Sequence, residues 1–201
     1  MKLLTTLFIL YGSIVYGQVS DFTKFKALSG PEKCWVFSHL FVAKKALLIT
    51  EMVREEAHAI LKENALAGSG NGGQIDAFRH VFWMANLTHS IGWRRARRLG
   101  IAHERGNYLD FKKGREEEGV VPDKISSEMD LFNNKVGIEL GKISLLENIK
   151  LAVVESILSG KCKILRMDEN GNYLDSKGKV LSEESFKGKW ENDKCLVWSN
   201  E

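Results

Sequence analysis

Two apolar segments carry polar side chains at a spacing that suits acid–base or metal chemistry. Asp76 and His80 lie in GQIDAFRHVFWMANL, and Asp130 and Asn134 lie in SSEMDLFNNKVGIELGK. Residues four apart project from the same face of a helix. Apolar residues surround the first pair almost completely, so it is expected to be buried. A buried charge is costly unless it is paired or bound to a metal ion.

A third segment, WRRARRLGIAHERGN, adds His103 on its inner face and Glu104 near its end. The leading hypothesis is a hydrolase that holds zinc or another divalent metal, because oxygen and nitrogen donors suit such ions. Its predicted metal ligands are Asp76, His80, His103 and Asp130. Glu104 is the predicted general base on a metal-bound water, whose pKa the metal lowers. His103 is also a catalytic candidate, and Asn134 is expected to orient the substrate or a ligand.

The ligand order His80, His103-Glu104, Asp130 is similar to that of helical metal-dependent phosphohydrolases, with glutamate in place of the expected aspartate. A second enzymatic hypothesis needs no metal: His80 or His103 acts as general base, oriented by Asp76 or Asp130. A third is a non-enzymatic envelope binding or structural module, in which the same side chains cap helix ends and form a buried polar network. No Ser or Cys lies in a recognisable nucleophile motif, so covalent catalysis is not indicated.

Five helical segments are expected to position these residues. Ser29 is a plausible N-cap and Pro31 suits a first turn, so a helix, or two abutting ones, is predicted from there to the glycine-rich stretch at 67–73. The residues before Ser29 are expected to be an irregular lead-in. The other helices are predicted at 74–90, 93 to about 105, 126 or 127 to about 141, and 145–160.

The fourth of these helices places Gly137 and Gly141 on the stripe of Asp130 and Asn134. Glycine lets another helix approach closely, so this stripe is predicted to face Asp76 and His80.

Beyond Gly160 the pattern changes to short apolar runs separated by Asn-Gly and Lys-Gly, which is typical of β-hairpins. The predicted fold is therefore mainly α, a bundle of about five helices over 18–160 with a small β-hairpin extension of the same domain over 161–201. The stretch DENGN within the extension is predicted to be a turn. It lacks the glycine at the sixth position and the distal bidentate glutamate of a calcium loop.

The first 17 residues have the layout of a secretory signal peptide: Lys2, an apolar run, and the small residues Val15 and Gly17 before a cleavage site. The run is shorter than the roughly 20 residues of a spanning helix. The predicted cut precedes Gln18 and not a cysteine, so no membrane anchor is expected. The protein is predicted to be exported, periplasmic or secreted, and to meet an envelope or extracellular substrate that the sequence does not specify.

The chain has 29 basic and 26 acidic residues, so its charge is a weak argument for any partner. The run RRARR at 94–98 could bind phosphates, but a solvated helix face is favoured and nucleic acid is not expected as a partner. Three cysteines are present. Either Cys162 pairs with Cys195, the favoured pairing, or all three are thiols.

The stretches PEKCWVFSHLFVAKKA, GNGGQIDAFRHVFWMA, AHERGNYLDFKKGR, SSEMDLFNNKVG and KGKWENDKC together resemble a bacterial family known only as a domain of unknown function. The resemblance extends from about Pro31 to the C-terminus. It implies an exported, all-helical domain with DAFRH, HE and MDxxNN segments as its signature, and it implies no known reaction.

Overall fold

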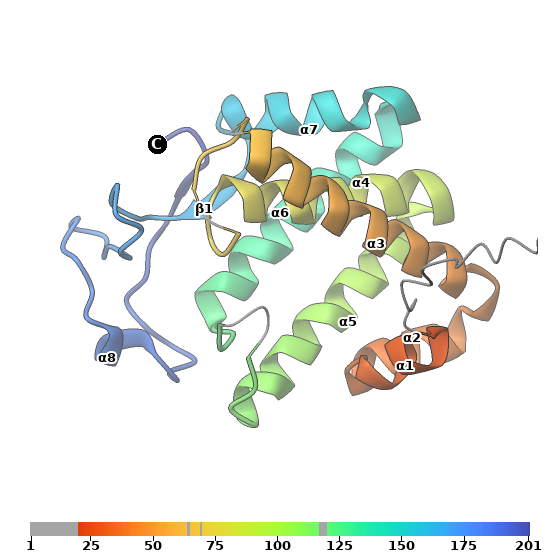
Figure 1. The fold of residues 1–201 in the computed structure, drawn as a ribbon, viewed down its shortest axis with the longest axis horizontal. Coiled ribbons are helices and arrows are strands. Elements are labelled where there is room, and N and C mark those ends of the chain that lie inside the picture. The colour runs from red at the N-terminus through yellow and green to blue at the C-terminus, as the bar shows by residue number, and fades with distance from the viewer. Residues whose placement is uncertain (1–19, 64, 69, 117–119) are drawn as a thin grey trace, which may run out of the picture.

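A computed structural model describes residues 20–63, 65–68, 70–116 and 120–201 (Figure 1). The predicted signal peptide and its cleavage site lie outside the described residues. The predicted mainly α fold is confirmed. Its helices are α1 (Asp21–Ala27), α2 (Gly30–Ser38), α3 (Leu40–Glu63), α4 (Gln74–Ile91), α5 (Trp93–Lys112), α6 (Lys124–Ile143), α7 (Ile149–Leu158) and α8 (Glu183–Phe186), with a 3-10 turn at Leu146–Asn148. Two short strands, β1 (Lys163–Leu165) and β2 (Leu196–Trp198), complete it.

Helix α4 forms the centre of the molecule and packs against α3, α5, α6 and α7. Most of its residues are buried, among them Phe78, Val81, Met84 and Leu87, which have no exposed surface. A helix that is apolar on nearly all sides is stable only when other elements surround it. The predicted burial of Asp76 and His80 on this helix is confirmed.

The N-terminal region differs from the predicted irregular lead-in, because residues 21–27 form α1. Ser20 caps this helix by accepting a hydrogen bond from the Thr23 backbone N–H. Ion pairs of Lys24 with Glu51 and of Asp21 with Lys44 hold α1 against α3. The ends of so short a helix are set by this cap and by tertiary charge pairs, which apolar periodicity does not report.

The segment after Ser29 forms two helices, and His39 separates α2 from α3. Ser29 is the N-cap of α2, as predicted. Its side chain accepts from the Glu32 N–H, and the Glu32 carboxylate accepts from the Ser29 N–H at 2.8 Å, which is a capping box.

Helices α4 and α6 lie against each other along the predicted stripes. A Cβ added at Gly137 would collide with the carbonyl oxygen of Val81, and one added at Gly141 would collide with that of Ala85. Only glycine permits this approach, which brings the polar residues of the two helices together. The inference that the stripes face each other is confirmed.

Three predicted helix ends were wrong. The helix predicted from 145 begins as α7 at Ile149, after the 3-10 turn at Leu146–Asn148. Helix α5 continues past Arg105 to Lys112, because Gly106 packs closely against Ser29 and the buried Asn107 lies within the helix. Helix α6 begins before Ser126 and Ser127, and its N-cap is Asp123, which accepts from the Ser126 N–H at 2.8 Å.

The C-terminal extension lies at the opposite end of the molecule from α1 and α2 (Figure 1). Strands β1 and β2 pair antiparallel, with Leu165 opposite Leu196. Single bridges, Met167 with Tyr173 and Leu174 with Val180, flank the Asn-Gly and Lys-Gly turns. The predicted β extension is confirmed, but its main pairing joins strands far apart in sequence.

The favoured Cys162–Cys195 disulfide is not formed, since all three cysteines are free thiols. The strand register explains this. Cys162 lies opposite Ser199, whose N–H donates to the Cys162 carbonyl, whereas Cys195 lies opposite Arg166. The two cysteines therefore sit at opposite ends of the ladder.

None of the helices in the described part of the chain is long and apolar enough to cross a membrane.

Candidate functional site

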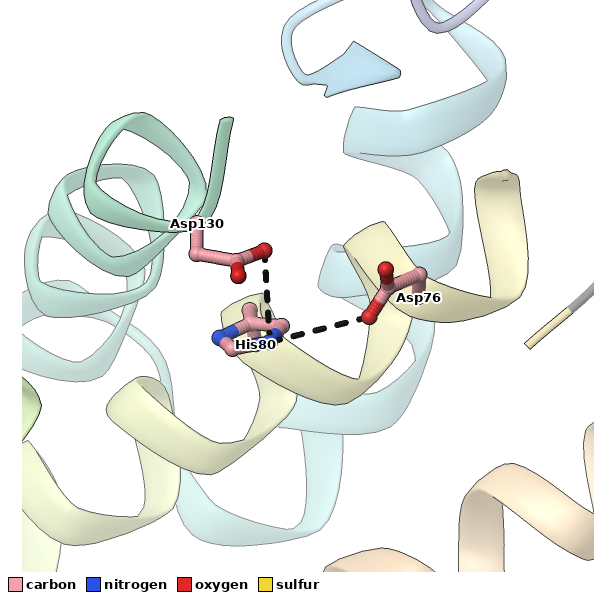
Figure 2. Close-up of side chains that lie close together, drawn as sticks. All are labelled: Asp76, His80 and Asp130. Atoms are coloured by element: carbon pink, nitrogen blue, oxygen red, sulfur yellow. Dashed lines mark ion pairs between the residues drawn. The ribbon is translucent and has the colours of Figure 1, made fainter. Parts of the chain in front are cut away.

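Asp76, His80 and Asp130 converge at the contact of α4 with α6 (Figure 2). The His80 Nε2 atom lies 3.3 Å from Asp130 Oδ1 and 3.6 Å from Asp76 Oδ1. All three residues are buried, and one donor atom from each lies within 4.8 Å of the other two. Carboxylate oxygens and an imidazole nitrogen so close together could hold a metal ion.

Asp76 is held in place by the backbone that precedes α4. Its Oδ2 atom accepts a hydrogen bond of 2.7 Å from the Gly72 N–H. Gly72 has φ of +79°, a conformation that favours glycine, and its carbonyl accepts from the Leu165 N–H of β1. The glycine-rich stretch before α4 therefore orients one carboxylate of the site.

Arg79 is a site residue that the sequence reasoning missed. Its Nη2 atom lies 2.6 Å from Asp76 Oδ1 and 3.5 Å from His80 Nε2. The i,i+3 spacing of Asp76 and Arg79 in the sequence is compatible with this ion pair. The guanidinium lies beside the atoms that a metal ion would contact.

The two adjacent asparagines of α6 have different contacts. Asn134 Oδ1 lies 3.4 Å from His80 Nδ1, on the other side of the imidazole from the carboxylates. Asn133 points away to β1, where its side chain donates to the Lys163 carbonyl and accepts from the Lys163 N–H, both at 2.9 Å. Asn134 thus belongs to the site, whereas Asn133 fixes the strand to the helix.

Three buried carboxylates give this region an excess of negative charge. Burial raises the pKa of Asp130 well above its usual value, and the charges of Asp76 and Glu104 raise it further, while Arg79 and His103 oppose the shift. Glu104 is buried on α5, and its Oε2 accepts from the Asn107 side chain at 3.3 Å. Glu104, the predicted general base, therefore influences the site by raising the pKa of Asp130 through its charge.

His103, the fourth predicted metal ligand, lies outside the group of three. Its Nδ1 is 3.1 Å from Glu32 Oε1, and its ring centroid is 6.2 Å from that of His80 and 5.5 Å from that of Trp83. Burial raises the pKa of Glu32, but the hydrogen bond and charge of His103, with the Ser29 hydrogen bonds, lower it to about 2. The sequence predicted Ser29 as a helix cap, but it gave no sign that Glu32 pairs with His103.

A cleft of about 530 Å³ opens beside these residues, between α1, α2, α3, α4 and α5. Its polar wall includes Arg79, His80, His103 and Glu32, and its apolar wall includes Trp35, Val36, Leu47, Val53, Trp83 and Leu99. His80 therefore contacts the carboxylates on one side and borders the cleft on the other.

The family described as Domain of unknown function (DUF6973) matches residues 33–162. The chain belongs to this family. The matched segment contains Asp76, His80, His103 and Asp130, and it ends just before β1. No curated protein and no solved structure matches the chain.

Proposed function

We propose that the protein is a metal-dependent hydrolase in which Asp76, His80 and Asp130 bind a divalent cation such as zinc. The observation that carries the proposal is the spacing of the three buried donor atoms. Zinc–ligand bonds of roughly 2.0–2.1 Å place tetrahedral ligands about 3.3 Å apart. The distances of 3.3 and 3.6 Å from His80 Nε2 to the two carboxylates match that separation.

Electrostatics supports the same proposal. Asp76, Asp130 and Glu104 are all buried, and buried carboxylates repel one another unless a cation offsets them. A divalent ion at the three donor atoms would favour the charged form of Asp130. Binding would therefore release a proton and strengthen as the pH rises.

Arg79 has to move for the cation to bind, because its guanidinium contacts Asp76 Oδ1 and lies near His80 Nε2. The side chain already borders the cleft. A shift of its end towards the cleft would present the guanidinium to a bound substrate, where it would favour a phosphate or carboxylate group.

His103 is the general acid–base that the geometry favours over Glu104. It borders the cleft, and Glu32 orients its ring through Nδ1. An imidazole oriented by a carboxylate at one ring nitrogen can hold and transfer a proton at the other. A metal ion at the neighbouring group would supply an activated water.

One observation favours the non-enzymatic alternative. Asp76 has partners without a metal ion, since it accepts from Gly72 and pairs with Arg79, and His80 lies against Asn134. In that case the same residues would form a buried polar network that specifies the packing of α4 on α6.

Measuring the metal content distinguishes the metal-dependent hydrolase from the non-enzymatic network. Protein purified without chelator, and protein reloaded with Zn²⁺, would be measured by elemental mass spectrometry and by calorimetric titration. We expect stoichiometric zinc and a rise in melting temperature on loading. His80→Gln and Asp130→Asn should lose the zinc, whereas Glu139→Gln, an exposed acid of the same helix outside the group, should keep it. A chain that binds no zinc after reloading would overturn the proposal.

Export remains part of the proposal and rests on residues 1–17 alone. N-terminal sequencing of protein recovered from outside the cytoplasm should begin at Gln18. Recovery of exported protein that still begins at Met1 would contradict it.

A further inference from the structure

Large apolar side chains are exposed at one end of the helical body. Phe41 is fully exposed, Ile143 is 82 % exposed, Phe37 67 %, Leu40 64 % and Trp93 40 %. We call these five residues the apolar end. Exposed apolar patches of this kind mark surfaces that bind another molecule.

The five residues come from different helices that meet in space. Lys45 Nζ donates to the Ser90 carbonyl at 3.2 Å, which ties the start of α3 to the end of α4. Lys142 Nζ lies 5.1 Å from the centre of the Trp93 ring, which brings in the end of α6. Figure 1 shows α2, the start of α3 and the end of α4 on the same side of the molecule.

The surroundings of the apolar end are basic. The sequence has no acid from 33 to 50 or from 77 to 103. Among the acids of other segments, Asp21 pairs with Lys44 and Glu139 pairs with Lys142. Exposed Arg94, Arg97 and Arg98 remain on the first turns of α5.

Two cations lie near the Trp93 ring: the Arg94 guanidinium is 4.8 Å and the Lys142 ammonium is 5.1 Å from the ring centre. An amphipathic indole among basic side chains is typical of the level of lipid headgroups. A shallow groove between α2 and α5 runs beside this surface, and Ser38, His39, Arg98 and Arg105 line it. Its guanidinium groups suit a phosphate.

We propose that the apolar end is a docking surface for an anionic lipid bilayer, with Phe37, Leu40 and Phe41 entering the boundary of the acyl chains. The combination favours lipid over nucleic acid, because apolar side chains at the centre of the surface add nothing to phosphate contacts. It fits an anionic bilayer, because exposed Arg94, Arg97 and Arg98 beside an apolar centre match charged headgroups above acyl chains. The surface does not depend on the hydrolase proposal.

The test is co-sedimentation with vesicles of phosphatidylcholine alone and of equal parts phosphatidylcholine and phosphatidylglycerol. We expect binding to the anionic vesicles that weakens with salt, since each basic side chain near such a surface strengthens binding roughly fivefold. Phe41→Ser with Ile143→Ser, and separately Arg94→Gln with Arg98→Gln, should each weaken binding at least tenfold. The matched controls are Leu158→Ser with Val180→Ser and Lys161→Gln with Lys177→Gln, exposed residues elsewhere that should leave binding unchanged.

Three results would overturn the proposal. The first is equal binding to neutral and anionic vesicles, or none to either. The second is loss of binding in the control variants to the same extent. The third is a chain that does not bind vesicles but binds duplex DNA, or that self-associates unless Phe41→Ser and Ile143→Ser are introduced.

Discussion

Helix α6 carries two buried aspartates, and their surroundings differ sharply. Asp123 at its N-terminus caps the helix, and its Oδ2 accepts from Lys194 Nζ at 2.8 Å and from the Asn192 side chain at 2.9 Å. Asp130, two turns later, has an Oδ1 atom with no hydrogen-bond donor among the described residues, although His80 Nε2 lies 3.3 Å away.

The difference separates a structural carboxylate from a candidate site. Asp123 has a cation and two further donors, so its charge fixes the C-terminal extension to the helical body. Asp130 has neighbours of the same charge, which raise its pKa. Carboxylates whose charge is poorly compensated concentrate at functional sites.

The largest expected effect comes from breaking the buried pair of Asp123 and Lys194. Lys194→Met should lower the free energy of unfolding by about 3–5 kcal/mol, because it leaves Asp123 buried without its cation. Urea denaturation measures this. The control is Lys124→Met, which removes the exposed pair with Glu191 and should cost less than about 1 kcal/mol. Equal losses would show that Asp123 and Lys194 do not act as a buried pair.

Glu32 is an intermediate case, a carboxylate satisfied by one histidine and a helix cap. Its pKa is lowered to about 2 from 4.5, so its contribution is present above pH 4.5 and is lost as the pH falls towards 2. Glu32→Gln should cost on the order of 3 kcal/mol at neutral pH. Between pH 2 and 4.5, the free energy of unfolding should depend more steeply on pH in the unmodified chain than in the variant. An identical pH profile for the variant would contradict the depressed pKa.

Gly137→Ala tests whether the site needs the close approach of α4 and α6. The added methyl group would meet the Val81 carbonyl, and overpacking of this kind costs about 1–3 kcal/mol. Thermal unfolding and zinc titration should both weaken. Gly30→Ala, where nothing lies within 4 Å of the added atom, should change neither. A Gly137 variant that retains zinc affinity would separate the site from the helix packing.

Asp130→Asn should have the smallest effect on stability, with no loss or a small gain. The pKa of Asp130 is raised in the folded state, so ionising this carboxyl lowers the stability of the fold as the pH rises above its ordinary pKa of 3.8. The amide does not ionise, so the variant lacks this decline. Zinc affinity should fall by more than the roughly 10–100-fold that loss of an outer-shell partner causes. A variant that unfolds readily and still binds zinc would show that Asp130, like Asp123, is a structural carboxylate.

The sequence predicted the part of the site that depends on positions within one helix. Asp76 with His80, and Asp130 with the glycines of α6, follow from a period of 3.6 residues, and the close approach follows from the absence of a Cβ. The sequence did not reveal Arg79 as a partner of Asp76, because charged residues near helix starts are common. The same period separated Asn134, which lies on the stripe of Asp130, from Asn133, but it could not show that Asn133 binds the backbone of Lys163.

What the sequence alone determined is which residues share a face of each helix, because that follows from local backbone geometry. What the tertiary structure decided is which faces meet and which partner each polar atom finds. Glu32 reaches His103 across 71 positions, Asp123 reaches Lys194 across 71, and β1 pairs with β2 at the end of the chain. Such contacts depend on how α2, α5 and the extension pack around α4. Local periodicity carries no information about that packing, because any of several faces could bury a similar apolar area.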